Sequence, residues 1–406
     1  MNDRLAFGSF ELDCARRVLL HEGNPVAAGS RAVDVLCELA LAHGELVSKD
    51  TLMERVWPGT VVTENSLQVH ISALRKAFAA QGGDRDWLQT VPGRGYRFIA
   101  PLRPLAAPTH PPAAGPAIDR AVHFVRAKDG VHIAASASGE GPDVLRAGVW
   151  MTHLEHEWTT HVWGPLNTRL SQQVRLIRYD QRGTGLSDRK VPPLDFETSV
   201  SDFEEVARRF ASGPIALLGI SQGAATAIEF AVRHPKRVSC MVLLGGYARG
   251  WRRRGEPETV QRGDAFQLLT LQGWGKVNPA FRQLFTSLGW PDASRAEMDA
   301  MNELQRVSAS AEIAAQIVGL TGGLDVSDRL RQVRVPTLVM HSERDAWVPV
   351  SLGRELATGI EGARFVALDS TSHVVQPSEP AWETCVATLL AFIAQHAGRG
   401  QQGTRN

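Results

Sequence analysis

The stretch LLGISQGAATAIEF, residues 217–230, places one serine between two glycines where an apolar run gives way to a helical pattern. The apolar run PIALLGI, residues 214–220, is typical of a buried strand, and the residues after it favour a helix. Gly219 and Gly223 permit a tight strand-to-helix turn that exposes Ser221. Because the Gly-x-Ser-x-Gly spacing is common, the role of this serine depends on residues further along the chain.

A serine acts as a nucleophile when a base removes its proton and a carboxylate orients that base. The sequence HSERDAWVP provides Asp345 just after one apolar strand candidate, and LDSTSHVVQ provides His373 just after the last. Asp345 lies 124 residues after Ser221, and His373 lies a further 28 residues on. A long insert before the acid and a short gap before the histidine are typical of a catalytic domain with an inserted cap.

Strand and helix patterns alternate through this part of the chain. Five apolar runs are strand candidates: residues 174–180, 214–220, 238–246, 336–342 and 363–369. This alternation predicts an α/β fold whose mostly parallel sheet is covered by helices on both faces. Residues 248–333 contain no strong strand candidate and are too numerous for a loop, so we expect a helical cap over the site.

The turn YDQRGTGLSD, residues 179–188, resembles the Asp-x-Arg-Gly-x-Gly-x-Ser motif of the α/β-hydrolase superfamily. Together with GISQG and the ordered Asp345 and His373, it makes residues 119–397 resemble that superfamily. The resemblance implies Ser221 as the nucleophile, His373 as the general base and Asp345 as the carboxylate that orients the base.

The same resemblance implies that the backbone N–H of Gln222 donates one hydrogen bond to a developing oxyanion. For the second donor, relatives carry a His-Gly pair after the third strand, whereas this chain has RAGVWMTHLEHEW. By position, the N–H of Trp150 or that of Met151 takes this role, and the sequence leaves both open.

The segment THLEHEWTTHVW gathers three histidines and two glutamates: His153, His156, His161, Glu155 and Glu157. A metal site is one interpretation, but the spacing matches no known ligand pattern, so we expect no metal and no cofactor. We expect His153 and Glu155 to line or brace the pocket entrance and the others to lie at the surface. The tryptophans 150, 158, 163 and 347 either line an apolar pocket or pack in the core, and we place Trp347 in the pocket.

Six prolines fall within PLRPLAAPTHPPAAGPAI, residues 101–118. Each proline fixes φ and lacks an N–H donor, so this segment is neither a helix nor a central strand. We expect an extended linker between an N-terminal unit, residues 1–100, and the α/β unit, residues 119–397. The tail, residues 398–406, is expected to be disordered.

Short strands, three helices and a hairpin are predicted for the N-terminal unit. Helical spacing is present in SRAVDVLCELALAHG, SKDTLMERVW and TENSLQVHISALRKAFAA. The inward face of the third helix consists of Leu67, Ile71, Leu74 and Phe78. DWLQTVPGRGYRFIA predicts two strands joined by a tight turn with Arg94 at its tip. These elements predict a winged helix-turn-helix, and we expect its third helix to enter the major groove of DNA.

The sequences VHISALRKAF and LQTVPGRGYRF closely resemble the OmpR/PhoB-type winged helix of bacterial transcription regulators, over nearly all of residues 5–100. The resemblance implies that His70 and Arg75 contact DNA from the recognition helix and that Thr90 and Arg94 belong to the wing. Other outward-facing polar residues complete the predicted DNA-binding surface: Gln68, Ser72 and Lys76. Ser72 and Ala73 stand where relatives often have arginines, and Pro92 departs from the common wing pattern. A helical module that binds protein is the alternative interpretation.

The composition is that of an ordinary globular protein of 406 residues with a net charge of +1. This balance gives no overall attraction to nucleic acid, so any DNA-binding surface must be local. The four cysteines form no CxxC pair and favour a reduced, cytoplasmic setting. The N-terminus lacks the apolar core of a signal peptide. The longest uncharged stretch, from Ala211, is interrupted by Gly, Pro, Ser and Gln, which predicts no membrane span.

These patterns predict a one-component bacterial transcription regulator that binds double-stranded DNA through its winged helix. Its α/β-hydrolase domain would sense a small apolar ester, lactone or related metabolite, either without turnover or with slow hydrolysis. A homodimer is expected, because winged helices of this type often bind repeated half-sites. The main alternative is a serine hydrolase of the esterase or lactonase type whose output is catalysis. A protein-interaction module built on the same fold is the third hypothesis.

Overall fold

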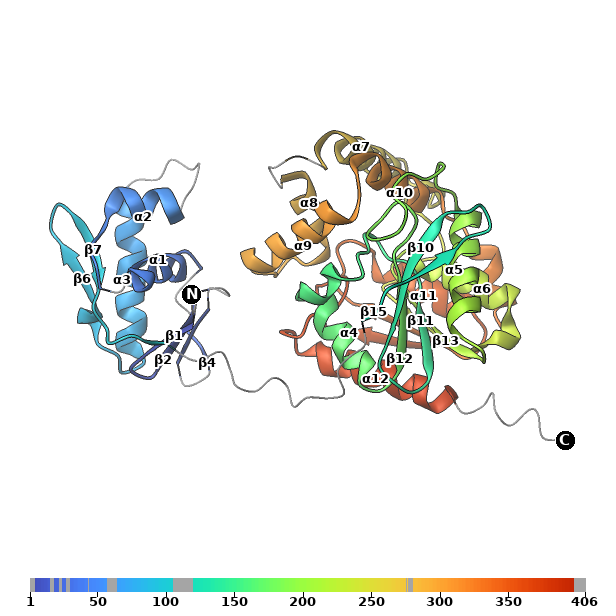
Figure 1. The fold of residues 1–406 in the computed structure, drawn as a ribbon, viewed down its shortest axis with the longest axis horizontal. Helices are drawn as coiled ribbons and strands as arrows, with labels where there is room; N and C mark the ends of the chain where they lie inside the picture. The colour runs from blue at the N-terminus through green and yellow to red at the C-terminus, as the bar shows by residue number, and fades with distance from the viewer. Residues whose placement is uncertain are drawn as a thin grey trace. The chain divides into compact units, whose positions relative to one another are not determined.

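The computed structural model describes residues 4–14, 18–21, 24–26, 30–42, 44–56, 64–104, 120–274, 276 and 280–397. Its contacts divide the chain into two compact units, Met1–Ala114 and Gly115–Asn406, and each is described by itself (Figure 1). Most of the predicted linker and all of the predicted tail lie outside the described residues.

The first unit contains a small antiparallel sheet. Its strands, in spatial order, are β4 (Asn24–Pro25), β3 (Val18–His21), β2 (Phe10–Asp13), β1 (Arg4–Phe7) and β8 (Arg103–Pro104). β8 is an edge strand, a position that tolerates the missing N–H of a proline. The start of the predicted linker is therefore paired with this sheet, a pairing that the proline content of the segment does not predict.

Three helices and a hairpin accompany the sheet, as the sequence predicts. The helices are α1 (Ser30–Leu41), α2 (Lys49–Val56) and α3 (Glu64–Ala80). The hairpin strands are β6 (Leu88–Val91) and β7 (Gly95–Phe98), and the short β5 (Val47–Ser48) pairs with β7. This arrangement confirms the winged helix-turn-helix.

α3 is held in the first unit by one apolar face. The buried side chains of that face are Leu67, Ile71, Leu74 and Phe78. The ring of Phe78 lies 5.7 Å from that of Phe7 and 5.4 Å from that of Phe10, centroid to centroid. Because burying each such side chain stabilises the fold by about 1.5–3 kcal/mol, this face fixes which residues of α3 point outward.

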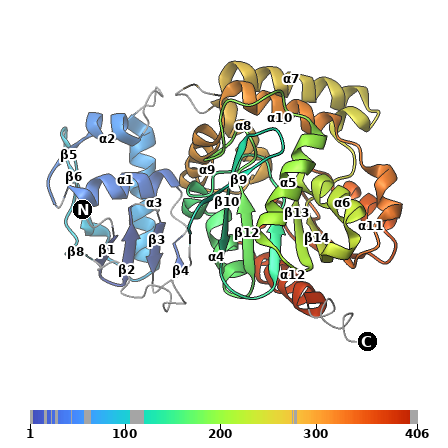
Figure 2. The same cartoon turned by 45° about the vertical axis from the view of Figure 1, so that its right-hand side comes forward.

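The second unit is built on an eight-stranded, mostly parallel sheet (Figure 2). In spatial order its strands are β16 (Arg364–Leu368), β15 (Thr337–Ser342), β14 (Val238–Leu244), β13 (Ile215–Ile220), β11 (Asp143–Arg146), β12 (Arg175–Tyr179), β10 (His132–Ser138) and β9 (His123–Arg126). β10 is antiparallel to both of its neighbours, and the six strands from β16 to β12 run parallel. The five strands predicted from apolar runs all form.

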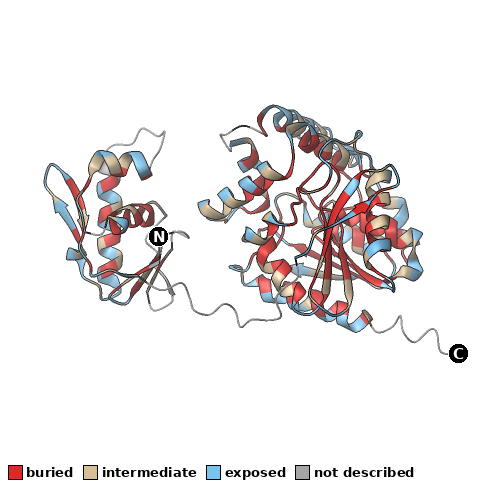
Figure 3. Ribbon diagram, viewed as in Figure 1, coloured by how far each residue is buried: buried red, intermediate tan, exposed pale blue. Residues whose placement is uncertain are grey.

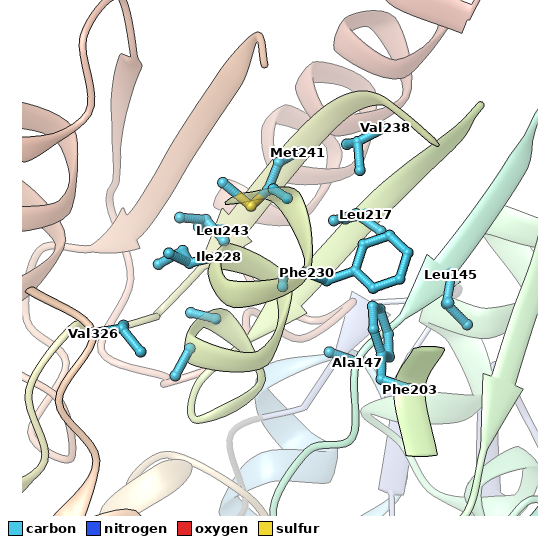
Figure 4. Packing of buried hydrophobic residues seen from close by; sticks show 14 of the residues in the cluster. Leu145, Ala147, Phe203, Leu217, Ile228, Phe230, Val238, Met241, Leu243 and Val326 are labelled. Atoms are coloured by element: carbon cyan, nitrogen blue, oxygen red, sulfur yellow. The ribbon is translucent and has the colours of Figure 1, made fainter. Parts of the chain in front are cut away.

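Helices cover both faces of this sheet. One face carries α5 (Phe196–Phe210), α6 (Gly223–Arg233) and α11 (Val350–Gly359), and the other carries α4 (Trp163–Ser171) and α12 (Ala381–Ala397). Successive side chains of β13 point to opposite faces of the sheet. Leu217 packs in the first core, under α5, α6 and α11, and Leu218 packs in the second, under α4 and α12. Figure 4 shows part of the first core, where the rings of Phe203 and Phe230 lie 5.1 Å apart. The central strands and the helix faces that pack on them are buried, as Figure 3 shows.

A helical cap is inserted between β14 and β15. Its helices are α7 (Pro257–Gly273), α8 (Ala280–Gly289), α9 (Arg295–Ser308) and α10 (Ala311–Gly323). Both Figure 1 and Figure 2 show α7 and α10 lying across one end of the sheet. The cap has its own apolar core, to which Trp274, Phe285 and Ile317 belong. Within the described part of the chain, no helix combines the length and the apolar character needed to cross a membrane.

Candidate functional site

The predicted nucleophile lies in a strained turn between β13 and α6. Ser221 has a φ of 53°, and it is the one non-glycine residue with positive φ among the described residues. Such a conformation costs about 1–3 kcal/mol and persists only where its surroundings enforce it. Flanking glycines make the turn possible, because a Cβ on Gly219 would lie 2.8 Å from Ala224 Cα and one on Gly223 would lie 2.9 Å from Gly148 O. The turn presents Ser221 to a cavity under the cap.

A short hydrogen bond joins His373 to Asp345. His373 Nδ1 lies 2.6 Å from Asp345 Oδ2, and both residues are buried. The other carboxylate oxygen, Oδ1, accepts the backbone N–H groups of Trp347 (2.8 Å) and Val348 (2.9 Å). Burial alone would raise the pKa of Asp345, but its charge interaction and hydrogen bond with His373 hold that pKa below its ordinary value. An ionised Asp345 favours the His373 tautomer with the proton on Nδ1.

His373 Nε2 is the atom that would accept a proton from Ser221. This nitrogen is buried and has no hydrogen-bond partner among the described residues. Ser221 and His373 line the same cavity, although no hydrogen bond joins Ser221 Oγ to His373 Nε2 in the described structure. Because such bonds are often long before a substrate binds, the arrangement is compatible with general-base chemistry.

The predicted oxyanion donors line this cavity as well. Gln222 directly precedes α6, while Trp150 and Met151 lie in the loop after β11. Gln181, which no sequence motif marks as functional, holds that loop: its Nε2 donates to Val149 O at 3.1 Å and to Trp150 O at 3.4 Å. In a trans peptide the C=O and N–H point to opposite sides, so the N–H groups of Trp150 and Met151 point away from Gln181. Both remain predicted donors, and Val149 shares the cavity wall with them.

The cavity beside Ser221 is small and mostly apolar. About 70 Å³ of it is open to water-sized molecules. Its walls come from the α/β core and from the cap, and they include Trp347, Trp150 and Phe285. The rings of Trp150 and Phe285 are stacked with their centroids 5.0 Å apart. Walls of this kind favour ligands with an apolar body.

The two residues of the histidine-rich segment that are expected at the pocket entrance do not line the cavity. His153 is buried and its Nδ1 accepts the N–H of His156 at 3.4 Å, while Glu155 is exposed. Neither His153 nor Glu155 lines the cavity beside Ser221. Within the described ranges, no group of three His, Cys, Asp or Glu side chains is arranged to hold a metal ion.

Glu157 of this segment lies in a buried ion network, so the expectation of a surface position is wrong. Its carboxylate accepts hydrogen bonds from Arg146 Nη2 (2.6 and 2.7 Å) and from Arg178 Nη1 (2.7 Å). Burial alone would raise the pKa of Glu157, but the two guanidinium groups hold that pKa below its ordinary value. Arg146 ends β11, so this network supports the loop that carries the predicted oxyanion donors.

Residues of the turn after β12 stabilise the loops around the site. Asp180 Oδ2 accepts the backbone N–H groups of Leu154 (3.1 Å) and Leu186 (2.8 Å), which ties two loops together. Arg182 forms an ion pair with Asp202 at 2.7 Å. Neither Asp180 nor Arg182 lines the cavity, so the motif shapes the chain around the site.

In the first unit, the predicted DNA-contacting face of α3 carries accessible polar side chains. Gln68, Ser72 and Lys76 are exposed, and His70 is half-buried. Burial and then the charge of Arg31 lower the pKa of His70 below its ordinary value. The neutral form of His70 is therefore favoured near pH 7, so the predicted DNA contact of this residue would be a hydrogen bond without a charge.

Arg75 connects the recognition helix to the wing. Its Nη2 donates to Leu88 O at 2.5 Å and to Thr90 Oγ1 at 2.9 Å, and these bonds hold β6 against α3. At the wing tip the N–H of Arg94 donates to Val91 O at 3.0 Å, and the Arg94 side chain is exposed. Arg94 is thus free to approach a phosphate, whereas the Arg75 guanidinium is engaged within the unit.

Sequence families agree with this geometry. Residues 165–375, just over half of the chain, match the family described as "Serine aminopeptidase, S33". The chain belongs to this α/β-hydrolase family. Residues 23–98 match the family described as "Transcriptional regulatory protein, C terminal", which is the OmpR/PhoB-type winged helix. This S33-family chain is therefore a fusion whose two parts imply DNA and a small molecule as partners.

Individual relatives of the S33-family domain carry several hydrolase names. The chain is 24% identical over 269 residues to AB hydrolase superfamily protein YisY of Bacillus subtilis, covering 62% of this chain and 92% of that protein. It is 26% identical over 239 residues to pyrrolizixenacetamide deacetylase of Xenorhabdus hominickii, covering 57% of this chain and 85% of that protein. Among solved structures, an esterase from Exiguobacterium antarcticum superposes with a TM-score of 0.58 at 25% identity, covering 67% of this chain and 98% of that one.

Replacing Arg94 of this S33-family fusion with Ala is expected to weaken DNA binding without changing the sequence preference. The loss of one phosphate contact should reduce the slope of log affinity against log salt by about 1. Fluorescence anisotropy of the full chain with a labelled duplex, between low and moderate salt, measures both quantities. Lys128→Ala, which removes an exposed lysine of the second unit, is the matched control. An unchanged slope in Arg94→Ala would place the wing tip away from DNA.

Proposed function

We propose that this protein is a one-component transcription regulator whose α/β-hydrolase domain binds a small apolar ester, lactone or related metabolite. The observation that carries the proposal is the presence, in one chain, of an OmpR/PhoB-type winged helix and a covered apolar cavity lined by Ser221 and His373. In this proposal residues 1–100 bind DNA, residues 119–397 bind the ligand, and residues 101–118 link them. Homodimerisation on repeated half-sites and a cytoplasmic location are parts of the same proposal.

We further propose that the site hydrolyses its ligand through an acyl-enzyme. Ser221 Oγ attacks the carbonyl carbon while its proton passes to His373 Nε2, and Asp345 stabilises the imidazolium through Nδ1. The oxyanion is bound by the N–H of Gln222 and by one from the loop after β11. His373 then protonates the leaving oxygen, and a water molecule deprotonated by His373 hydrolyses the acyl-serine. Every proton removed from a nucleophile thus returns to a leaving group.

Hydrogen bonds join the loop beside Ser221 to the cap at the wall of the cavity. Trp150 Nε1 donates to Gln305 Oε1 of α9 at 3.2 Å, and Gln305 Nε2 donates to Thr286 Oγ1 of α8 at 2.8 Å. Trp150, Thr286 and Gln305 all line the cavity, so an occupant touches both the loop beside Ser221 and the cap. Sensing requires only that the ligand bind the DNA-competent and DNA-incompetent states with different affinity.

The second candidate function is a serine hydrolase whose main output is catalysis and whose winged helix localises the enzyme. The strained φ of Ser221 and the 2.6 Å bond between His373 and Asp345 favour this candidate, because a pure sensor has no need of either feature.

One substitution separates sensing from catalysis. Ser221→Ala removes the proposed nucleophile, and we expect the variant still to bind ligand. If a DNA-dependent reporter still responds to ligand in this variant, occupancy is the signal. If the response disappears while calorimetry still detects ligand binding, turnover is required. A full chain that fails to bind any DNA at moderate salt would contradict the regulator proposal.

A further inference from the structure

A second cavity adjoins the one beside Ser221. It opens among the cap helices, and about 360 Å³ of it is available to water-sized molecules. Five residues line both cavities and form the partition between them: Trp150, Tyr247, Phe285, Thr321 and Trp347. Three of its aromatic rings, those of Trp150, Phe285 and Trp347, are in contact, and the Phe285 and Trp347 ring centroids lie 5.4 Å apart. A ligand that reached from Ser221 into the cap would pass along these aromatic side chains.

Arg254 is a half-buried cation in the wall of this second cavity. Its Nε donates to Arg249 O at 3.0 Å, and its guanidinium carbon lies 5.3 Å from the centre of the Tyr247 ring. Among the described residues, its Nη1 and Nη2 groups have no hydrogen-bond partner, and no carboxylate lies within 4.0 Å of it. The terminal donors of this cavity-lining side chain are thus available to a ligand.

Two neighbouring arginines, in contrast, have carboxylate partners. Arg249 pairs with Glu355 at 2.9 Å, and Arg252 pairs with Asp264 at 2.8 Å. Burial lowers the pKa of Arg254 below its ordinary value, and electrostatic interactions with Tyr247, Glu256 and Glu355 only partly oppose this effect. A partly desolvated cation without an ion-pair partner is unfavourable unless an anion joins it.

We propose that the second cavity binds the anionic end of a bipartite ligand, in which an apolar chain connects the reacting carbonyl at Ser221 to a carboxylate at Arg254. This inference rests on the proposed function, since it names the ligand class of the same site. The planar guanidinium matches a carboxylate with two parallel hydrogen bonds, which a point charge does not. The aromatic partition contacts the apolar chain between the two ends.

Matched pairs of esters test this proposal. Monomethyl suberate carries a carboxylate where methyl octanoate carries a methyl group, and monomethyl adipate and sebacate with methyl hexanoate and decanoate extend the series. The full chain with Ser221→Ala prevents turnover, so calorimetry reports binding alone. We expect the anionic ester of the best length to bind about tenfold or more tightly than its neutral partner.

Arg254→Gln, added to Ser221→Ala, should reduce this preference to within about twofold by weakening binding of the anion alone. Arg254→Lys should retain part of the preference, which separates loss of charge from loss of packing. Arg252→Gln, which removes an arginine that already has a carboxylate partner, should leave the preference unchanged.

Two results would overturn the inference, and they differ in what they say of the proposed function. If both esters bind equally, or if Arg254→Gln leaves the preference intact, the carboxylate site is wrong while ligand binding at Ser221 stands. If no ester of either series binds, both the inference and the proposed ligand class fail.

Discussion

Replacing Ser221 with Ala is expected to lower kcat for hydrolysis of p-nitrophenyl butyrate by about 10⁴-fold or more. The substitution deletes the Oγ atom that forms the acyl-enzyme and leaves the fold unchanged. His373 and Asp345, which act through that oxygen, then have no nucleophile to activate. Alanine also carries a Cβ, so the strain of the 53° φ at position 221 remains and the stability is expected to change little.

Stopped-flow release of p-nitrophenolate by the full chain measures this effect. Ser199→Ala is a suitable control, because Ser199 lies on α5, where its hydroxyl donates to the Asp195 carbonyl, and it does not line the cavity. The control should retain wild-type turnover. If Ser221→Ala kept more than about a tenth of the wild-type kcat, an acyl-enzyme on Ser221 would be contradicted.

Replacing Glu157 with Gln is expected to destabilise the second unit by about 3–5 kcal/mol. The carboxylate holds Arg146 and Arg178, and all three side chains are no more than 1% exposed. Glutamine has nearly the same volume, so packing is preserved while two buried guanidinium groups lose their counter-charge. The effect is therefore electrostatic, and it should be accompanied by loss of order in the loop after β11.

Urea denaturation of the full chain, followed by tryptophan fluorescence and by loss of esterase activity, measures the free energy of unfolding of this unit. The control is Glu383→Gln, which breaks an ion pair with Arg169 at 3.0 Å in which Glu383 is 70% exposed. Exposed pairs of this kind contribute about 1 kcal/mol or less. Similar losses in the two variants would show that the Glu157 network does not depend on its buried charge.

The parts of the fold that the sequence predicts well are those with a local signal. Five strands are runs of apolar residues, of which the four inner ones are almost wholly buried, and the winged helix has the four-three-four spacing of Leu67, Ile71, Leu74 and Phe78. β9, β10 and β11 lack this signal, because β10 reads HIAASAS, whose small residues have little strand preference, and β11 is only four residues long. β9 and β10 are stabilised by pairing with each other, and β10 also pairs with β12.

Some residues of the site could also be predicted from a local sequence signal, and others could not. Ser221, Asp345 and His373 each follow a strand at its carboxyl end, where a parallel sheet brings such residues together. Glu157 and Gln181 have no such marker, because their partners Arg146, Arg178 and Trp150 are brought to them only by the fold. Arg75 occupies a predicted DNA-contact position, yet its hydrogen bonds to β6 depend on how the hairpin packs against α3.

The central claim is that occupancy of the cavity beside Ser221 changes DNA binding by the same chain. Ethyl p-nitrophenyl hexylphosphonate tests it, because displacement of p-nitrophenolate by Ser221 would leave a tetrahedral adduct in the cavity. Anisotropy with a duplex selected by the unmodified full chain then gives the Kd for DNA before and after labelling. We predict a change of about fivefold or more in the wild type and none in Ser221→Ala. Complete labelling of Ser221, shown by mass spectrometry, with a Kd that stays within about twofold would contradict the claim.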